Sequence, residues 1–322
     1  MCPCGQRDRR LALESPLLAD IFGSHFVSLR RVSTSHYFDP WHQKRVTRLL
    51  CRETDFPAWR LTWIIPLYTV GPMSPHKSHA RQAGARELLV ERMENVLTFT
   101  LDNAQQGNEV TGRMLDLMQS ELEREARRPK ARVLRIRARG EVFCSGRERA
   151  GRDAQSIGEE AARLIRTKRL LRESPLISVA EVQGDALGFG FGLAIVCDFA
   201  LVAQQAVLGF PEMRFGLAPS AIISYLVDYA LPRFAFPLVL FGDTINAQQA
   251  LQMGLISQVC TLENLAHEAD RLITRILRLD STAVRRCKQF FTAAQQNSFE
   301  QNCRLAAEAL TVDSLARLAR GK

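Results

Sequence analysis

Residues 184–198 read GDALGFGFGLAIVCD, with Gly188, Gly190 and Gly192 at alternate positions before an apolar run. Residues 176–182, LISVAEV, have the composition of a strand, so the sequence predicts a strand, a glycine turn and the start of a helix. Such a turn leaves backbone N–H groups without intrahelical partners, where an oxygen could bind them. Close packing of a helix on a strand is the simpler explanation for an isolated run of this kind.

Two nucleotide-binding motifs fit this stretch poorly. Gly188 and Gly190 supply the first half of a G-x-G-x-x-G fingerprint, but its third glycine position holds Leu193. No early βαβ unit surrounds the motif, which such a fingerprint requires. A P-loop fails as well, because no Gly-Lys-Ser/Thr follows.

A second glycine turn lies about forty residues upstream. Residues 140–148 read GEVFCSGRE and follow residues 133–138, VLRIRA, which alternate as a strand does. Two turns at strand ends can each donate one N–H to a single oxygen. We therefore expect an oxyanion hole, a pair of donors for an oxygen that becomes negative during a reaction.

The order of predicted elements indicates an α/β fold with a helical C-terminal part. Short apolar or alternating runs predict strands, and longer amphipathic runs predict helices. The expected strands are a pair within 88–102, then 133–138, 176–182, 199–203 and 207–210. The expected helices are 108–128, 158–172, 235–241, 247–253, 263–279, 282–296 and 298–311.

Charge and composition divide the chain near residue 85. The 322 residues carry a formal charge of +9, but residues 1–85 hold 12 Lys and Arg against 6 Asp and Glu, while the rest is nearly balanced. The basic, aromatic face of a nucleic-acid binder is not visible. We expect residues 1–85 to be a disordered or wrongly assigned extension, with translation starting at Met73. Residues 86–262 would form the core domain and residues 263–322 a C-terminal helical region.

Cysteine usage and hydropathy indicate a cytoplasmic protein with reduced thiols. The eight cysteines are widely spread, and no Cys or His pair matches Cys2 and Cys4 at zinc-site spacing, so we expect no metal. Residues 186–203 are apolar, but Asp198 and the glycines argue against a membrane span. The arginine-rich start leaves a transit peptide as an alternative, weakened by its acidic residues.

At this point the sequence resembles the crotonase superfamily, which contains enoyl-CoA hydratases and isomerases. The resemblance covers about residues 88–312. It rests on four motifs in the family's order: VFCSGRE at 142–148, VQGDALGFGFGLAIVCDFALVA at 182–203, LGFPEMRFGLAP at 208–219 and TINAQQALQMGLISQV at 244–259.

The resemblance implies a superhelix of ββα units, C-terminal helices that build a homotrimer or a dimer of trimers, and an acyl-CoA thioester as substrate. Coenzyme A would come only as part of that substrate, with no separate cofactor. The thioester oxygen would accept backbone N–H bonds from Ser145 and Phe189. Neighbouring residues expected to contact substrate are Cys144, Gly146, Gly188 and Gly190.

The resemblance also implies which residues move protons. Hydratases of this family use two glutamates, and the corresponding positions here hold Gly192 and Glu212. A single glutamate suffices to move a proton from C2 to C4, so we expect an isomerase with Glu212 as base and acid. A loop-fixing carboxylate, paired with Arg214, is the structural alternative for this residue.

Basic residues offer less specific expectations for CoA. Arg147, with Arg149 and Arg152, could meet CoA phosphates, although a solvated basic stretch explains them as well. Lys288 could approach the CoA 3'-phosphate in an oligomer. The chain ends in DSLARLARGK and lacks the tail with which many family members cover CoA. Cys197 and Asp198 match a fold feature rather than a reactive one.

Three functions stay open on the sequence. The first is an isomerase-type enzyme on enoyl-CoA, using Glu212 alone. The second is an enoyl-CoA hydratase or an acyl-CoA thioester hydrolase. The third is a protein of this fold that binds acyl-CoA but has lost catalysis.

Overall fold

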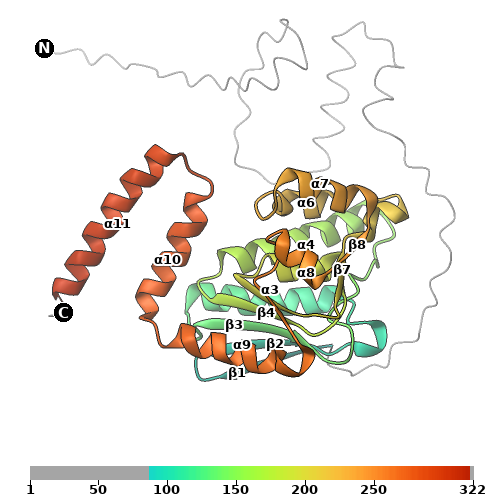
Figure 1. The fold of residues 1–322 in the computed structure, drawn as a ribbon, viewed down its shortest axis with the longest axis horizontal. Helices are drawn as coiled ribbons and strands as arrows, with labels where there is room; N and C mark the ends of the chain where they lie inside the picture. Colours follow the sequence, from blue (N-terminus) through green and yellow to red (C-terminus); the bar gives the residue numbers. More distant parts are fainter. Residues whose placement is uncertain (1–86, 320–322) are drawn as a thin grey trace, which may run out of the picture. The chain divides into compact units, whose positions relative to one another are not determined.

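The computed structural model describes residues 87–319, which form two sheets covered by helices (Figure 1). The expectations for residues 1–85 and for a start at Met73 fall outside this range. The predicted α/β class is confirmed within it.

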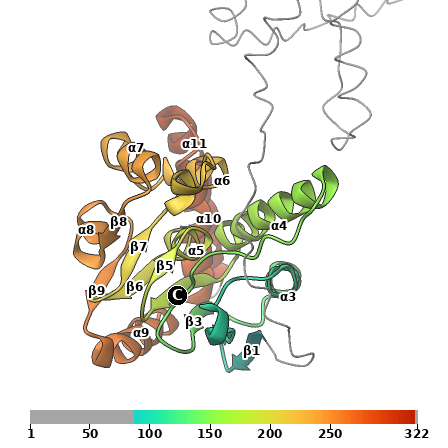
Figure 2. The same cartoon turned by 90° about the vertical axis from the view of Figure 1, so that its right-hand side faces the viewer.

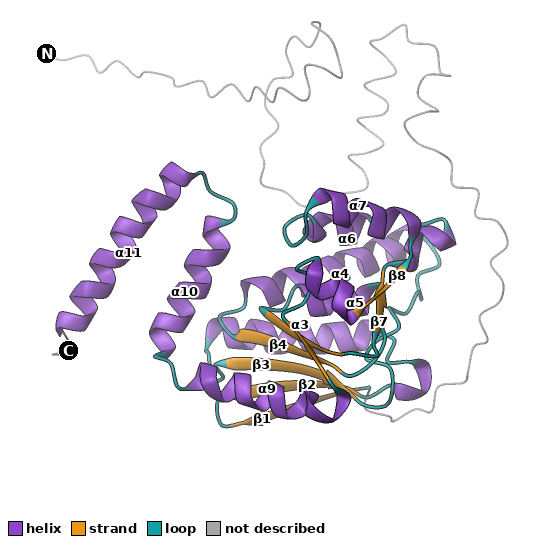
Figure 3. Ribbon diagram, viewed as in Figure 1, coloured by secondary structure: helices purple, strands orange, loops and turns teal. Residues whose placement is uncertain are grey.

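The larger sheet has six strands in the order β1-β2-β3-β4-β6-β9, and Figure 3 labels the first four of them in this order. Its first two strands form an antiparallel hairpin, and every later pair is parallel. Parallel strands need helical crossovers, which bury both faces and explain the continuous apolar runs. The strands are β1 (Leu88–Met93), β2 (Val96–Leu101), β3 (Val133–Ala138), β4 (Ile177–Val182), β6 (Phe199–Ala203) and β9 (Gln258–Cys260).

Helices cover the two faces of this sheet (Figure 2). On one face lie α3 (Gly112–Arg127) and α4 (Ala154–Glu173), which are capped at their N-termini by the side chains of Thr111 and Asp153. On the other face lies α9 (Leu262–Leu277), whose buried apolar residues recur at helical spacing and pack on the strands. These two layers hold the sheet rigid beneath the glycine turns.

The smaller sheet positions the candidate site. It consists of β5 (Ala186–Leu187), β7 (Val207–Gly209) and β8 (Thr244–Asn246), with β7 between the other two. The short helix α5 (Phe189–Ile195) follows β5, and the 3-10 helix η3 (Pro211–Phe215) follows β7. Because β5 and β7 are parallel, the segments that follow them leave the sheet at the same edge.

The remaining helices are η2 (Ala104–Gln106), α6 (Ser220–Leu226), α7 (Pro232–Phe241), α8 (Ala247–Gln252), α10 (Ser281–Ala294) and α11 (Phe299–Ala319). In Figure 1, α10 and α11 form an antiparallel pair beside the sheets. Several large apolar side chains of α11 are exposed, among them Leu310 at 68% and Leu318 at 73%. Within the described range no helix is long and apolar enough to cross a bilayer.

Most expected elements are present, and the missed strands have a common cause. The strands β5, β8 and β9 have only two or three residues, too few to show a period of two. The helix α6 was also missed, and α7 begins three residues earlier than expected, with Pro232 as its first residue. Proline is favoured there because its missing N–H would have no partner anyway.

Candidate active site

The two glycine turns lie side by side, as the sequence predicts. Cys144 forms a parallel bridge with Ala186, and the N–H of Leu187 donates to the Cys144 oxygen at 2.9 Å. The N–H groups of Phe143 and Cys144 both donate to the Asp185 oxygen, at 3.0 and 3.1 Å. Backbone pairing therefore fixes the turn at residues 140–148 against the start of α5.

The free N–H groups differ from the expected pair. Within residues 87–319, no backbone carbonyl accepts from the N–H of Phe189, the first residue of α5. The Ser145 N–H, however, donates to the Gly107 oxygen at 2.9 Å. It is not available to a substrate in this structure, which corrects the expectation for Ser145. Two residues on, the Arg147 N–H has no backbone acceptor among the described residues.

Two glycines of the expected set are needed for backbone reasons. A Cβ at Gly190 would overlap the Cys144 carbonyl and lie 2.8 Å from its Sγ, so no side chain fits between the turns. Gly146 has a φ of +143°, which other residues rarely adopt.

The Cys144 thiol donates to the Gly146 oxygen, and burial raises the pKa of this thiol to about 12. Cys144 is therefore a neutral packing group and not a nucleophile.

Glu212 lies in η3, opposite the glycine turn. A Cβ at Gly188 would come within 2.8 Å of Glu212 Oε1, and Gly188 has a φ of +51°. The other carboxyl oxygen, Oε2, is buried without a hydrogen-bond partner in the described part of the chain. Arg214 pairs with Asp243 at 2.7 Å, so the alternative of a Glu212–Arg214 pair is not observed.

Burial raises the pKa of the Glu212 carboxyl, and nearby positive charge from Lys168, Arg149 and Arg147 acts against this rise. A carboxyl whose charged form is disfavoured can carry a proton closer to neutral pH.

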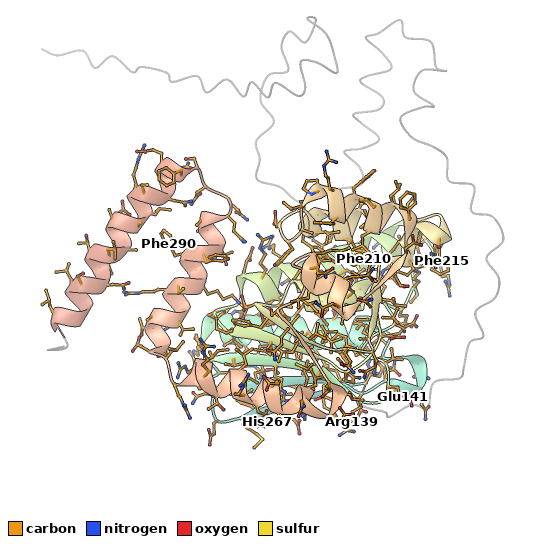
Figure 4. The ribbon with its side chains drawn as sticks, viewed as in Figure 1. Arg139, Glu141, Phe210, Phe215, His267 and Phe290 are labelled. Atoms are coloured by element: carbon orange, nitrogen blue, oxygen red, sulfur yellow. The ribbon has the colours of Figure 1, made fainter. Side chains whose placement is uncertain are left out.

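Two phenylalanines, labelled in Figure 4, mark the ends of the segment that carries Glu212: Phe210 precedes η3 and Phe215 is its last residue. Phe210 is fully buried and stacks on Phe191 with ring centroids 5.0 Å apart, which anchors η3 against α5.

Sequence reasoning missed one pair of residues at this site. Lys168 of α4 is only 9% exposed, and its Nζ donates to the Tyr225 hydroxyl of α6 at 2.5 Å. The same Nζ lies 4.8 Å from the centre of the Phe189 ring. A Cβ at Gly192 would overlap both the Lys168 ammonium and the Tyr225 hydroxyl. The pair therefore fills the space into which a side chain at position 192 would project.

The basic residues are distributed differently from the expectation. Lys288 is 9% exposed, and its Nζ donates to Asp198 Oδ2 and to the Leu176 oxygen, both at 2.7 Å. This corrects the expectation for Lys288, because its charge ties α10 to the sheet and is not free for a phosphate. The Arg147 guanidinium contacts Glu160 at 3.4 Å. Arg149 lies 5.9 Å from the centre of the exposed Phe215 ring.

Asp198 has a structural role, as the sequence indicated. Its Oδ2 accepts hydrogen bonds from the Ser178 N–H and hydroxyl at 2.7 and 2.8 Å, besides the bond from Lys288. Within residues 87–319, no group of three or more His, Cys, Asp or Glu side chains is placed to hold a metal ion.

Comparison with known families and curated proteins gives a consistent result. The family model described as enoyl-CoA hydratase/isomerase matches residues 91–315. The chain is 30% identical over 271 residues to enoyl-CoA hydratase domain-containing protein 3, mitochondrial, of Rattus norvegicus, covering 81% of this chain and 88% of that protein. It is 30% identical over 214 residues to 2,3-dehydroadipyl-CoA hydratase of Escherichia coli, covering 65% and 83%.

Solved structures agree with this result. The crystal structure of human enoyl-CoA hydratase domain-containing protein 3 has a TM-score of 0.68 and 25% identity, covering 72% of this chain and 92% of that one. An enoyl-CoA hydratase from Mycobacterium smegmatis has a TM-score of 0.69 at 22% identity, covering 74% and 98%, and supports the fold alone. The predicted crotonase-like fold is thus confirmed.

Proposed function

The chain belongs to the enoyl-CoA hydratase/isomerase family, and from this premise we propose that it adds water to 2-enoyl-CoA thioesters, with Glu212 as the acid that protonates C2. The observation that carries the proposal is the Glu212 carboxyl: its Oε2 is buried without a hydrogen-bond partner among residues 87–319, and its Oε1 lies beside Gly188, next to the Phe189 N–H that has no backbone acceptor there. The named relatives support hydration over other reactions, because the curated protein from Escherichia coli carries that activity in its name.

The thioester oxygen would accept from the Phe189 N–H and, in place of Ser145, from the Arg147 N–H. A donor of this kind contributes about 3 kcal/mol to the stability of the transition state, since it is aligned before charge develops. Only backbone atoms are used, so the large side chains at both positions are compatible with the role.

Hydration then requires two proton movements. Water oxygen bonds to C3 as a base takes one of its protons, and the electron pair of the C2–C3 double bond moves towards the thioester oxygen. The resulting enolate takes a proton at C2 from the Glu212 carboxyl, giving the 3-hydroxyacyl thioester. Burial keeps a proton on Glu212 at higher pH than an exposed carboxyl would hold it.

Isomerisation is the second candidate, because Gly192 leaves one carboxylate in the site. Glu212 would remove a proton from C2 of a 3-enoyl thioester and return it to C4 through a dienolate, whose oxygen the same backbone N–H groups would stabilise. This reaction needs no water and no second base.

Product identification distinguishes the two reactions and tests Glu212. A 2-enoyl-CoA and a 3-enoyl-CoA are incubated separately with the full-length protein, and the products are identified by mass spectrometry. We expect a 3-hydroxyacyl-CoA from the first substrate, and a loss of about a hundredfold or more in Glu212→Gln. Glu159→Gln, an exposed glutamate of α4, is the matched control. Full activity of Glu212→Gln, or binding of both thioesters without turnover, contradicts the proposal.

Assembly and location extend the proposal. We propose that the exposed apolar residues of α11 bury themselves in a homotrimer, or a dimer of trimers, because large exposed apolar surfaces mark interfaces. The scattered cysteines support the cytoplasm, whereas the name of the rat relative supports mitochondria for that protein. Microscopy of a C-terminally tagged chain decides between the two compartments.

A further inference from the structure

Lys168 is an unusual residue for a protein interior. Its Nζ lies 4.1 Å from the Tyr225 ring centre and 4.8 Å from the Phe189 ring centre, and its hydrogen-bond partner is the Tyr225 hydroxyl. No ion pair to Lys168 occurs among residues 87–319, whereas the equally buried Lys288 is paired with Asp198. Burying an ammonium without a carboxylate costs free energy, so packing alone would favour an apolar residue here.

The position of this lysine relative to Glu212 is set by α5. The Glu212 carboxyl lies over Gly188, and the Lys168–Tyr225 pair lies over Gly192. Gly188 is the N-cap of α5, with a positive φ, and Gly192 lies inside the helix. Lys168 and Glu212 are near enough for the charge of each to act on the pKa of the other, and Lys168 Nζ lies 4.8 Å from the ring centre of Phe189, whose N–H has no backbone acceptor among residues 87–319. A thioester whose oxygen binds the Phe189 N–H would therefore lie beside both groups.

We propose that Lys168 and Tyr225 form the second proton carrier of this site and take the proton from the water that adds to C3 of the enoyl thioester. The proposal rests on the proposed hydration and deepens it by naming the base that hydration needs. It also gives Gly192 a role, because only glycine leaves room for the pair.

The proton balance of the step is complete. When Lys168 is neutral, its amine accepts a hydrogen bond from the Tyr225 hydroxyl across the same short contact. As the water oxygen bonds to C3, one water proton passes to the Tyr225 oxygen while the Tyr225 proton passes to the Lys168 amine. Glu212 gives its proton to C2, so the step ends with an ammonium and a carboxylate. A proton then returns from Lys168 to Glu212 through solvent, which restores both neutral groups. Neither an oxidant nor another reactant is required.

The electrostatics of the site agree with this starting state. Burial lowers the pKa of Lys168 to about 7, while the charge of Glu212 from η3 and, more weakly, of Cys144 raises it. Burial also raises the pKa of Glu212, and it raises that of Tyr225 of α6 well above 10, so the tyrosine keeps its proton. Both shifts move Lys168 and Glu212 towards the neutral amine and the neutral acid. These are the forms that the step consumes.

Two substitutions and two readouts test the pair in the full-length protein. Lys168→Met and Tyr225→Phe keep the volume of each side chain. Tyr229→Phe is the matched control, since Tyr229 follows α6 and the charges that act on it, led by that of Arg172, do not include Lys168. The first readout is hydration of a 2-enoyl-CoA. The second is exchange of the C2 hydrogen of a saturated acyl-CoA in D2O, which needs Glu212 and the oxyanion donors but no water activation.

We expect Lys168→Met and Tyr225→Phe each to lose hydration by about a hundredfold or more, and C2 exchange to persist. In the wild type, the hydration rate should fall as the pH is lowered and Lys168 becomes protonated. In Lys168→Met this fall should be absent. Hydration retained in Lys168→Met, with thermal unfolding confirming a folded chain, overturns the inference alone. A wild type that exchanges C2 but never hydrates overturns both the inference and the proposed hydration.

Discussion

Replacing Lys168 by methionine should stabilise the protein near neutral pH, and this effect should shrink as the pH rises. Burial lowers the pKa of Lys168 from 10.5 to about 7. The unfolded chain therefore holds a proton that the folded chain holds only in part. This difference corresponds to about 4 kcal/mol of lost stability at pH 7. Methionine removes that cost. It also leaves the Tyr225 hydroxyl without its hydrogen-bond partner, which lowers the free energy of unfolding by about 1–3 kcal/mol.

The sign of the pH dependence follows from the same protons. Between pH 7 and 9 the unfolded state binds more protons than the folded state, so Lys168 makes the free energy of unfolding rise with pH. The advantage of Lys168→Met over wild type should fall by about 2 kcal/mol across this window. Urea unfolding of both proteins at pH 7 and 9 measures it, and comparing the two cancels the contributions of the buried cysteines. If the difference in free energy of unfolding between Lys168→Met and wild type is the same at pH 7 and pH 9, the desolvation of Lys168 is refuted.

Three further outcomes are expected. Lys288→Met should lower the free energy of unfolding by about 2 kcal/mol, because it leaves the partly exposed Asp198 unpaired; unchanged urea unfolding would contradict this. Gly190→Ala should abolish hydration at a cost of about 1–3 kcal/mol in stability, because its methyl overlaps the Cys144 carbonyl; an active, wild-type-like variant would contradict the close packing of the turns. Leu310→Lys should dissociate the proposed trimer in light scattering, and an unchanged mass would contradict an interface at α11.

Local motifs predicted much of the candidate site. The glycine turn could be predicted because each glycine is required by its local backbone geometry, such as the positive φ of Gly188 or the close backbone approach at Gly190. Glu212 could be placed because it lies at a fixed distance from that turn in a recognisable motif. Its isolation from Arg214 could not be predicted, since it depends on Asp243 in a distant loop.

Long-range pairing explains the errors. Ser145 looked suitable as a donor because the sequence does not reveal that Gly107 lies beside it and accepts its N–H. Lys168 lies among charged neighbours on a helix and reads as a solvated residue. Its burial depends on Tyr225, which lies 57 residues later and on a helix that the sequence analysis missed.

The geometry at Gly192 allows either a carboxylate side chain at this position or the Lys168–Tyr225 pair, but not both. A carboxylate side chain on α5 would need the space that the Lys168 ammonium and the Tyr225 hydroxyl already fill. Read from the sequence, Gly192 is a missing acid, and it favours a reaction with one proton carrier. In the structure the same glycine is what admits a base from α4 and its partner from α6. The number of acid–base groups at this site therefore depends on the packing around position 192 and not on the residue at that position alone.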